Sequence, residues 1–309
     1  MTIGFVGLGQ MGKPMALNLT KSPGTYIVYA RRSDHFAEFA DRGVRATTRA
    51  ADLADVNVLF LSLPSTSAVN EVLFGSDGIA KQLQRGTLVV DTSTISYGAT
   101  VEVGKTLRGM QISFIDAPVS GMQARAEAGT LTIMCGGSET DLERVRPLLE
   151  KMGNNILYMG ATGAGQLTKL INQLLFDINA AAIAEVLPMA VKMGLDPEKV
   201  GSVVNSGTGK SYASEFFIPR ILNSSFSDGY PMKHAYKDLV SAAELSAANG
   251  IPMPVLAAAT ATYQQALLRG YGDHDKGGMI RVFEDLLGVS FRKANCRTNE
   301  RSAEKDRNR

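Results

Sequence analysis

The first half of the chain alternates short apolar runs with helical patterns, whereas the second half shows helical patterns alone. The apolar runs end at glycine, proline or polar residues, as buried strands do. They lie at residues 3–6, 26–29, 56–61, 87–90, 112–115 and 156–159. Helical patterns come between them, at residues 68–74, 99–107 and 138–151. Repeated strand–helix units predict a mostly parallel sheet that is covered on both faces.

One long helical pattern links the two halves. It runs from Gly163 to Gly194 and contains a single proline, Pro188; at 1.5 Å per residue such a helix spans about 45 Å. A further helix starts at Asp196 and Pro197, and later helical patterns lie at 212–222, 232–249, 255–268 and 279–287. Gly207, Gly250, Gly270 and Gly288 would end four of these helices. The residues from Lys293 onward are almost all polar or charged, which is typical of disorder. We therefore predict a first domain, a helical domain and a disordered tail, at residues 1–162, 163–292 and 293–309.

Composition narrows the function classes. Of 309 residues, 45% are hydrophobic and 20% charged, and the net charge is +2, so there is no basic excess to indicate nucleic acid. The two cysteines, Cys135 and Cys296, cannot make a disulfide framework, and the three histidines lie far apart. We therefore expect a reducing compartment and no metal site. The first residues show neither a signal peptide nor a membrane span, so a cytoplasmic protein without a membrane or nucleic-acid partner is expected.

A glycine-rich turn follows the first apolar run. Its residues are Gly7, Leu8, Gly9, Gln10, Met11 and Gly12, and a helical pattern comes next. In this context the first glycine permits a tight turn, the second lets backbone approach a pyrophosphate, and the third lets the helix pack closely on the strand. The helix N-terminus supplies N–H groups for the phosphates. We predict a dinucleotide site; a glycine-rich turn without a ligand is the alternative.

The end of the second strand indicates which dinucleotide is bound. A fold that prefers NAD usually carries an acidic residue there, for the ribose 2′-hydroxyl. This chain instead has Ala30, Arg31 and Arg32, with no acid before Asp34. Because guanidinium groups match phosphate oxygens, we predict NADP, with NAD as a second choice. The alternative is that the two arginines form a solvated turn.

Other strand ends supply further candidates, because ligands on a parallel sheet bind outside the carboxyl ends of its strands. This rule places Leu63, Pro64, Ser93 and Thr94 beside the cofactor, unless they form ordinary turns. Ser120, Gly121 and Met122 are interpreted as a loop at a strand end. Its backbone N–H groups and hydroxyl can grip a carboxylate.

The start of the long helix carries a lysine and two carboxamides. Lys169 is followed three and four residues later by Asn172 and Gln173, so all three share one helix face. A site at a domain junction is one interpretation, and a solvated turn at the start of a connecting helix is the other.

Five motifs in this chain resemble those of the β-hydroxyacid dehydrogenase family, which includes 3-hydroxyisobutyrate dehydrogenase and tartronate semialdehyde reductase. In chain order they are Gly7-Leu8-Gly9-Gln10-Met11-Gly12-Lys13-Pro14-Met15-Ala16-x-Asn18-Leu19, Asp91-x-Ser93-Thr94, Asp116-Ala117-Pro118-Val119-Ser120-Gly121, Gly163-x-Gly165-Gln166-x-x-Lys169-x-x-Asn172-Gln173 and Lys237-Asp238-Leu239. The resemblance implies the α/β class, with an N-terminal Rossmann-like doubly wound sheet joined by a long helix to an all-α C-terminal domain.

The resemblance also assigns roles. Lys169 matches the family's catalytic lysine. Ser120 and Gly121 match its substrate-carboxylate loop, and Asn172 and Gln173 match its substrate-side carboxamides. Further positions match residues that approach the cofactor or its nicotinamide end: Leu63, Pro64, Thr94 and Lys237. One departure stands out, because the family's loop usually reads Ser-Gly-Gly and its second glycine is Met122 here.

Together these observations predict reversible hydride transfer between NADP and a small β-hydroxyacid that bears a carboxylate. Lys169 would take the hydroxyl proton in oxidation or donate a proton to the carbonyl oxygen in reduction. Desolvation and a neighbouring Lys237 would lower the pKa of Lys169 toward neutrality. Imine reduction on the same fold and a non-catalytic NADP-binding protein are the alternatives. A homodimer or homotetramer through the helical domain is also expected.

Overall fold

The computed structural model describes residues 1–293 of the chain. It divides into two compact units, one of residues Met1–Lys169 and one that begins at Leu170. The predicted domain boundary, after residue 162, lies just before the long helix, whereas the compact units divide within that helix. The predicted disordered tail lies outside the described residues except for Lys293, which donates its backbone N–H to the carbonyl oxygen of Leu222.

The first unit is built on one sheet of nine strands. The strands are β1 Thr2–Val6, β2 Thr25–Tyr29, β3 Arg45–Thr47, β4 Val58–Leu61, β5 Leu88–Asp91, β6 Ser113–Asp116, β7 Val119–Ser120, β8 Leu131–Gly137 and β9 Gly153–Gly160. Strands β3, β2, β1, β4, β5 and β6 pair in that order and are all parallel. Strand β8 reverses direction against β6 and β7 and runs parallel to β9.

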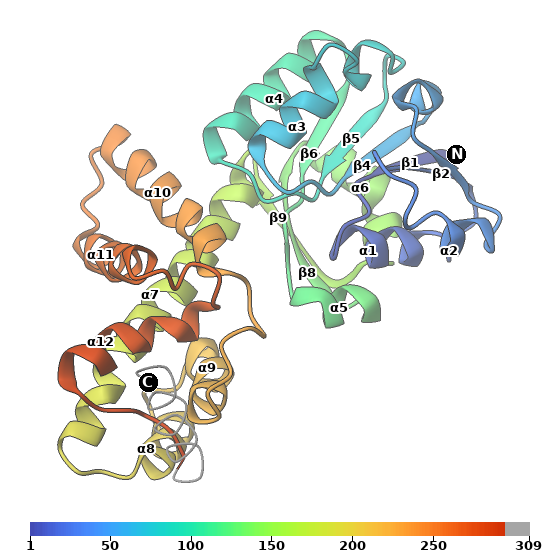
Figure 1. Cartoon of the computed structure of the whole chain (residues 1–309). Helices are drawn as coiled ribbons and strands as arrows, with labels where there is room; N and C mark the ends of the chain where they lie inside the picture. The colour runs from blue at the N-terminus through green and yellow to red at the C-terminus, as the bar shows by residue number, and fades with distance from the viewer. Residues whose placement is uncertain (294–309) are drawn as a thin grey trace. The chain divides into compact units, whose positions relative to one another are not determined.

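Helices cover both faces of this sheet, as Figure 1 shows. They are α1 Gly12–Leu19, α2 Ala37–Ala40, α3 Thr66–Phe74, α4 Tyr97–Gly109, α5 Met122–Ala128 and α6 Glu139–Leu149, with short 3-10 turns at Ala50–Leu53 and Ile79–Lys81. Alternate strand residues enter two different cores. Val58 and Phe60 pack with α1, α5 and α6, whereas Leu59 and Leu61 pack with α3 and α4. The mostly parallel, two-faced sheet expected from the apolar runs is therefore confirmed, as is the doubly wound fold that the family resemblance implies.

The second unit contains helices throughout residues 170–293, apart from one isolated bridge between Pro231 and Asp275. Its elements are α7 Ala164–Lys192, which starts in the first unit, α8 Pro197–Ser206, α9 Tyr212–Leu222, α10 Met232–Ala248, α11 Pro254–Leu268, a 3-10 turn at Lys276–Met279 and α12 Ile280–Leu287. Helix α8 begins as its sequence suggests, because the Asp196 carboxylate accepts the N–H groups of Glu198 and Lys199. The all-helical second half is confirmed.

Helix α7 is the one element of residues 1–293 that is long and apolar enough to span a membrane by length and composition. That test is weak evidence, because the core helix of a soluble protein passes it as well. Leu174, Ala181 and Leu187 of α7 lie in the apolar core of the helical unit, whereas several of its apolar residues are exposed: Ile171, Leu175, Val186 and Met189. Self-association through the helical unit stays a prediction, which the sedimentation mass of the full chain would test.

Several elements were not predicted from the sequence, among them the short elements β3, α2, β7 and α5. One of them changes an interpretation. Ser120, Gly121 and Met122 do not form a simple loop, because Ser120 ends β7 and Met122 begins α5. A strand of two residues and a helix of seven are too short to show a period in the sequence.

Candidate functional site

The carboxyl ends of five parallel strands form one continuous edge in the first unit. Tyr29 pairs with Val6, Val6 with Leu61, Leu61 with Asp91, and Asp91 with Asp116. Most of the predicted cofactor residues follow directly after this row. The chain passes from β1 to β2 and β3 on one side of β1, and then continues with β4 on the other side. In such a sheet, ligands bind in the crevice at the strand where the order changes direction, which is β1 here.

In the glycine turn after β1, two glycines lie against backbone atoms, and the glycine between them faces open space. A Cβ atom added to Gly7 would approach the Ser62 carbonyl oxygen to 2.2 Å, and one added to Gly12 would approach the Gly7 oxygen to 2.0 Å. Gly7 also has a φ of +96°, which favours glycine. A Cβ atom on Gly9 would meet nothing within 4 Å. Helix α1 begins after Met11 without a side-chain cap, which leaves N–H groups for an anion. The turn therefore fits a dinucleotide pyrophosphate.

Arg31 and Arg32 follow β2, the strand next to β1. Both side chains are exposed, and Arg32 forms a surface ion pair with Asp34 at 3.4 Å between Nε and Oδ2. Such exposed pairs contribute little to stability, so the guanidinium groups remain available to a 2′-phosphate.

The turns after β4 and β5 are tied together. The Leu63 N–H donates to Ser93 Oγ at 2.8 Å, and the Ser93 N–H donates to Asp91 Oδ1 at 2.9 Å. Thr94, the next residue, is half-buried at this junction, and Pro64 is exposed. The structure therefore brings Leu63 and the Ser93–Thr94 turn together at the predicted edge.

Two buried carboxyl groups lie side by side on this edge. Burial is the main cause that raises the pKa of Asp91 to about 6 and that of Asp116 to about 6, from an ordinary value of 3.8. The negative charge of Asp116 raises the pKa of Asp91 further. Because a raised carboxyl pKa favours the protonated folded state, the stability these groups contribute is full below about pH 4 and is lost as pH rises through 6.

The Asp116 carboxylate caps the helix that carries Lys169. Its Oδ1 accepts the Gly163 N–H at 2.7 Å and its Oδ2 accepts the Gln166 N–H at 2.9 Å. The Gln166 side chain then reaches the β5 turn, donating to the Ser93 carbonyl oxygen at 2.7 Å. Lys169 lies one turn further along α7 and is buried, with 8% of its surface exposed. A solvated turn, the alternative interpretation of this stretch, does not describe a lysine in that position.

The predicted carboxylate loop lies against β8, as does the start of α7. Ser120 pairs with Thr132 of β8, and a Cβ atom added to Gly165 would approach the Met134 carbonyl oxygen of β8 to 2.3 Å. Gly121 has a φ of +143°. Met122 has a φ of +58° and is 44% exposed. The residue that departs from the family motif therefore stands in a conformation that favours glycine.

We expect the Met122→Gly variant to unfold at a higher temperature than the wild type. A left-handed conformation costs a non-glycine residue about 1–2 kcal/mol, and glycine avoids that cost. The matched control is Gln123→Gly, at the next position of α5 and outside the positive-φ set. The control should lose about 1 kcal/mol because glycine weakens a helix. Equal destabilisation of both variants by thermal unfolding would show that Met122 is not strained.

The remaining predicted site residues belong to the second unit. Asn172 and Gln173 follow Lys169 on α7, where Asn172 is exposed and Gln173 half-buried. Lys237 is half-buried on α10. Their convergence on Lys169 and the Ser120 loop stays a prediction.

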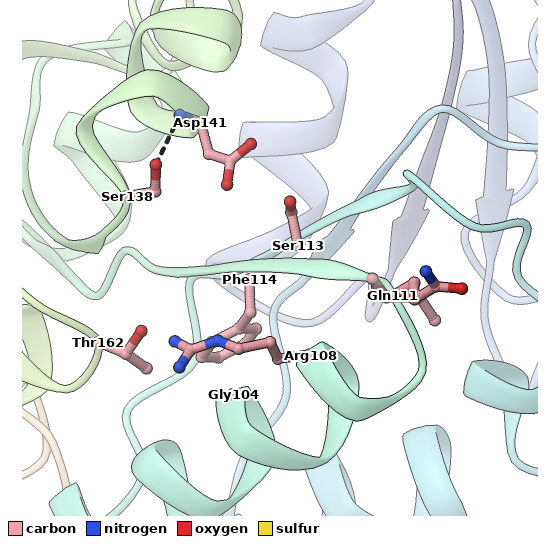
Figure 2. A pocket seen from close by; sticks show the side chains of 9 residues that line it. Gly104, Arg108, Gln111, Ser113, Phe114, Ser138, Asp141 and Thr162 are labelled. Atoms are coloured by element: carbon pink, nitrogen blue, oxygen red, sulfur yellow. Dashed lines mark hydrogen bonds between the residues drawn. The ribbon is translucent and has the colours of Figure 1, made fainter.

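A cavity of about 290 Å³ lies elsewhere on the first unit, as Figure 2 shows. It is lined by residues of α4, by Ser113 and Phe114 at the start of β6, and by the Ser138 cap of α6. None of the predicted site residues lines it. It opens at the amino end of β6, whereas the predicted ligand edge lies at the carboxyl ends. Within residues 1–293, no three histidine, cysteine or acidic side chains are grouped so as to hold a metal ion.

No role was predicted from the sequence for Asp91, Asp116 or Gln166, although the two acids stand at the ends of apolar strand runs. A signal was present, because a carboxylate stands directly at the end of two successive buried strands. A buried acid in that position requires partners, and the sequence does not show where they are.

Two family models match the chain and meet at the start of α7. Residues 2–160 match the NAD binding domain of 6-phosphogluconate dehydrogenase. Residues 163–283 match the NAD-binding model of NADP-dependent 3-hydroxyisobutyrate dehydrogenase. Together these models cover the sheet with its glycine turn and nearly all of the helical unit.

Known proteins resemble this chain over almost its full length. A 2-(hydroxymethyl)glutarate dehydrogenase from Eubacterium barkeri is 37% identical over 290 residues, which are 93% of this chain and 96% of the relative. The solved structure of Mycobacterium tuberculosis 3-hydroxyisobutyrate dehydrogenase with L-serine has a TM-score of 0.81 at 31% identity, covering 91% of this chain and 98% of that one. Psf3 in complex with NADP+ and 2-OPP has a TM-score of 0.77 at 26% identity, covering 92% and 99%. On these matches, and on the five motifs that the fold places as described, the chain belongs to the β-hydroxyacid dehydrogenase family of NAD(P)-binding oxidoreductases.

Proposed function

We propose that the protein is an NADP-dependent oxidoreductase that interconverts a small β-hydroxyacid and its semialdehyde, with Lys169 as the proton-transferring group. The observation that carries the proposal is the position of Lys169, which is buried one turn after a helix start that is tied to the strand edge bearing the glycine turn. Burial keeps bulk water away from the amine, as a group that exchanges a proton with a bound substrate requires.

The names of the relatives support a substrate class. The names 2-(hydroxymethyl)glutarate dehydrogenase and 3-hydroxyisobutyrate dehydrogenase each state a hydroxyacid, and the solved 3-hydroxyisobutyrate dehydrogenase contains L-serine. Each of these compounds is a carboxylate whose neighbouring carbon bears a CH₂OH group. We therefore infer a primary-alcohol β-hydroxyacid as the substrate of this chain, and the corresponding aldehyde as its product.

The residues at the strand edge fit a nicotinamide dinucleotide. The turn with Gly7, Gly9 and Gly12 would hold its pyrophosphate, and Arg31 and Arg32 would hold a 2′-phosphate. When bound, the cofactor supplies or accepts the hydride. The chain's own residues then orient the substrate and move its proton.

Lys169 donates a proton to the substrate's carbonyl oxygen during reduction and takes the hydroxyl proton during oxidation. The hydroxyl and backbone N–H groups at Ser120 and Gly121 hold the carboxylate, because such groups at a strand end bind anions. Asn172 and Gln173 are assigned to the substrate's oxygen atoms, and Lys237 to the nicotinamide end, by analogy with the family.

The Arg31→Ala and Arg32→Ala variants are expected to raise the KM for NADPH while leaving the KM for NADH nearly unchanged. A charged hydrogen bond contributes about 1.5–3 kcal/mol, so the double variant should lose tenfold or more in kcat/KM with NADPH. Arg85→Ala is the matched control, because Arg85 is also exposed but lies before β5, at the amino end of the sheet. Steady-state kinetics with both cofactors are the measurement. A wild-type preference for NADH would contradict the assignment.

Paired substrates test the reaction itself. NADPH consumption is measured with semialdehydes of small carboxylic acids, with the same aldehydes as neutral amides, and with cyclic imines. The proposal expects turnover of the carboxylate-bearing semialdehydes and much weaker turnover of the amides. Faster reduction of the imines would favour the imine reductase alternative. Tight NADPH binding without consumption of any carbonyl compound would favour a non-catalytic protein.

A further inference from the structure

We propose that Asp116 is a positioning residue for Lys169, holding the first turn of α7 against the carboxyl edge of the sheet. The catalytic part of this inference rests on the proposed function of Lys169. The capping part rests on contacts within the first unit alone.

The contacts of Asp116 join two elements that are distant in sequence. The side chain stands at the end of β6 and is fully buried. Its two oxygens accept N–H groups from two different residues of the helix start, Gly163 at 2.7 Å and Gln166 at 2.9 Å. The first N–H groups of a helix have no partner inside the helix. A carboxylate satisfies them and also interacts favourably with the positive end of the helix dipole.

Two glycines leave room for this carboxylate. A Cβ atom added to Gly136 of β8 would lie 2.6 Å from Asp116 Oδ1, and one added to Gly165 would lie 2.8 Å from Asp116 Oδ2. Both distances are shorter than real Cβ contacts. The β8 strand, the start of α7 and the carboxylate therefore meet too closely for any side chain between them, and the carboxylate has little freedom to move.

Gln166 extends the connection toward the cofactor side. Besides donating its backbone N–H to Asp116, it donates its side-chain Nε2 to the Ser93 carbonyl oxygen at 2.7 Å and accepts the Ile95 N–H at 3.3 Å. Ser93 in turn accepts the Leu63 N–H at 2.8 Å. One hydrogen-bond network therefore joins the turns after β4 and β5 to the start of α7.

This hydrogen-bond network fixes the position of Lys169, because Lys169 lies three residues after Gln166 on a continuous helix. A displacement of about 1 Å in a catalytic group lowers a rate about 100-fold. Loss of the Asp116 cap would allow the first turn of α7 to fray. The lysine would then shift while the glycine turn and the two arginines, which would hold the cofactor, stay in place.

The test compares Asp116→Ala, Asp116→Asn and Lys169→Ala with a matched control. The control is Asp196→Ala, because the Asp196 carboxylate also caps a helix, accepting two backbone N–H groups of α8 through Oδ1, but it follows α7 at the end far from Lys169. Two measurements are made on each full-length variant. One is steady-state kinetics with NADPH. The other is hydrogen exchange of the Gly163 and Gln166 amides.

We expect Asp116→Ala to lower kcat about 100-fold, with the KM for NADPH changed less than about threefold. The exchange rates of the Gly163 and Gln166 amides should rise about tenfold or more. Asp116→Asn, which retains one acceptor oxygen, should recover part of kcat and part of the protection. Asp196→Ala should lower the unfolding temperature and leave kcat unchanged.

The outcomes separate the two proposals. If Lys169→Ala abolishes turnover while both Asp116 variants keep wild-type kcat, the positioning inference is overturned and the proposed function stands. If Lys169→Ala remains active, the proposed function fails, and the exchange of the two amides still decides whether Asp116 caps α7. If Asp116→Ala does not fold, the Asp116→Asn variant decides, and unchanged amide protection together with unchanged kcat overturns the inference.

Discussion

The Lys169→Ala variant is expected to lower kcat by a factor of about 10²–10⁴, the range that a positioned acid or base contributes. Lys169 is buried next to a helix start fixed by Asp116, so water is poorly placed to replace its amine. NADPH affinity should change little, because the glycine turn and the two arginines that would hold the cofactor lie elsewhere on the edge. Steady-state kinetics and a fluorescence titration with NADPH measure the two effects separately.

The control for this prediction is Lys192→Ala. Lys192 lies in the last turn of the same helix and donates to the Leu287 carbonyl oxygen, so the substitution removes a lysine without touching the predicted site. Lys192→Ala should retain full kcat. A small primary amine added to Lys169→Ala should restore part of the lost rate, because it can enter the space left by the side chain. Turnover by Lys169→Ala close to that of the wild type would refute the role of Lys169.

The second large effect is on stability, and we expect it from Lys276→Met. Lys276 pairs with Asp177 of α7, and the two side chains are 2% and 0% exposed. The ammonium group also lies 4.1 Å from the centre of the Phe176 ring. Removing one partner of a buried pair leaves an uncompensated charge, which typically costs about 3–5 kcal/mol. Thermal and denaturant unfolding of the full chain should show a loss of this size.

The pH dependence of this loss has a definite sign. Burial is the main cause that raises the pKa of Asp177 to about 6 from 3.8, and the charge on Lys276 opposes the shift. Without Lys276 the carboxyl favours the protonated state still more strongly. The destabilisation of Lys276→Met should therefore be small at about pH 4 and grow as pH rises through 6.

Two further variants test whether the broken buried ion pair causes the stability loss of Lys276→Met. Lys233→Met removes the lysine of an exposed pair with Asp273, whose side chains are 49% and 82% exposed, and should change stability by less than about 1 kcal/mol. The double variant Lys276→Met with Asp177→Leu replaces both charges by apolar groups and should recover most of the loss. A single variant as stable as Lys233→Met would show that the buried pair contributes nothing.

The fold was accessible from the sequence because its main elements are long and periodic. The strand runs are apolar and bounded by turn residues, the 29-residue helix α7 carries one long helical pattern, and the glycine turn stands between a strand run and a helical pattern. Elements without a period, such as the two-residue β7 and the start of α5 at Met122, were not predicted. The sequence shows that Met122 stands where the family motif has a glycine. It does not show that Met122 adopts a positive φ, because that conformation belongs to the turn between β7 and α5.

Only part of the candidate site could be predicted from the sequence. The motifs and their order along the chain predicted the roles of Lys169 and the glycine turn. The turn follows a strand run, and Lys169 lies near the start of a long helical pattern. The partners of Asp116 were hidden, because Gly163 and Gln166 lie 47 and 50 residues further along the chain. A sequence pattern describes neighbours along one helix or strand, and a carboxylate that caps a helix from another strand has no such pattern.

Hydride transfer assisted by Lys169 is tested most directly by following the hydride itself. The enzyme is incubated with NADPH that carries deuterium at the transferable position of its nicotinamide and with a semialdehyde that bears a carboxylate on the neighbouring carbon. We expect the wild type to form a β-hydroxyacid with one deuterium on the carbon that bears the hydroxyl group, and Lys169→Ala to form it at least about 100-fold more slowly. Oxidation of NADPH without deuterium in the hydroxyacid, or labelling at equal rates by the wild type and Lys169→Ala, would contradict this mechanism.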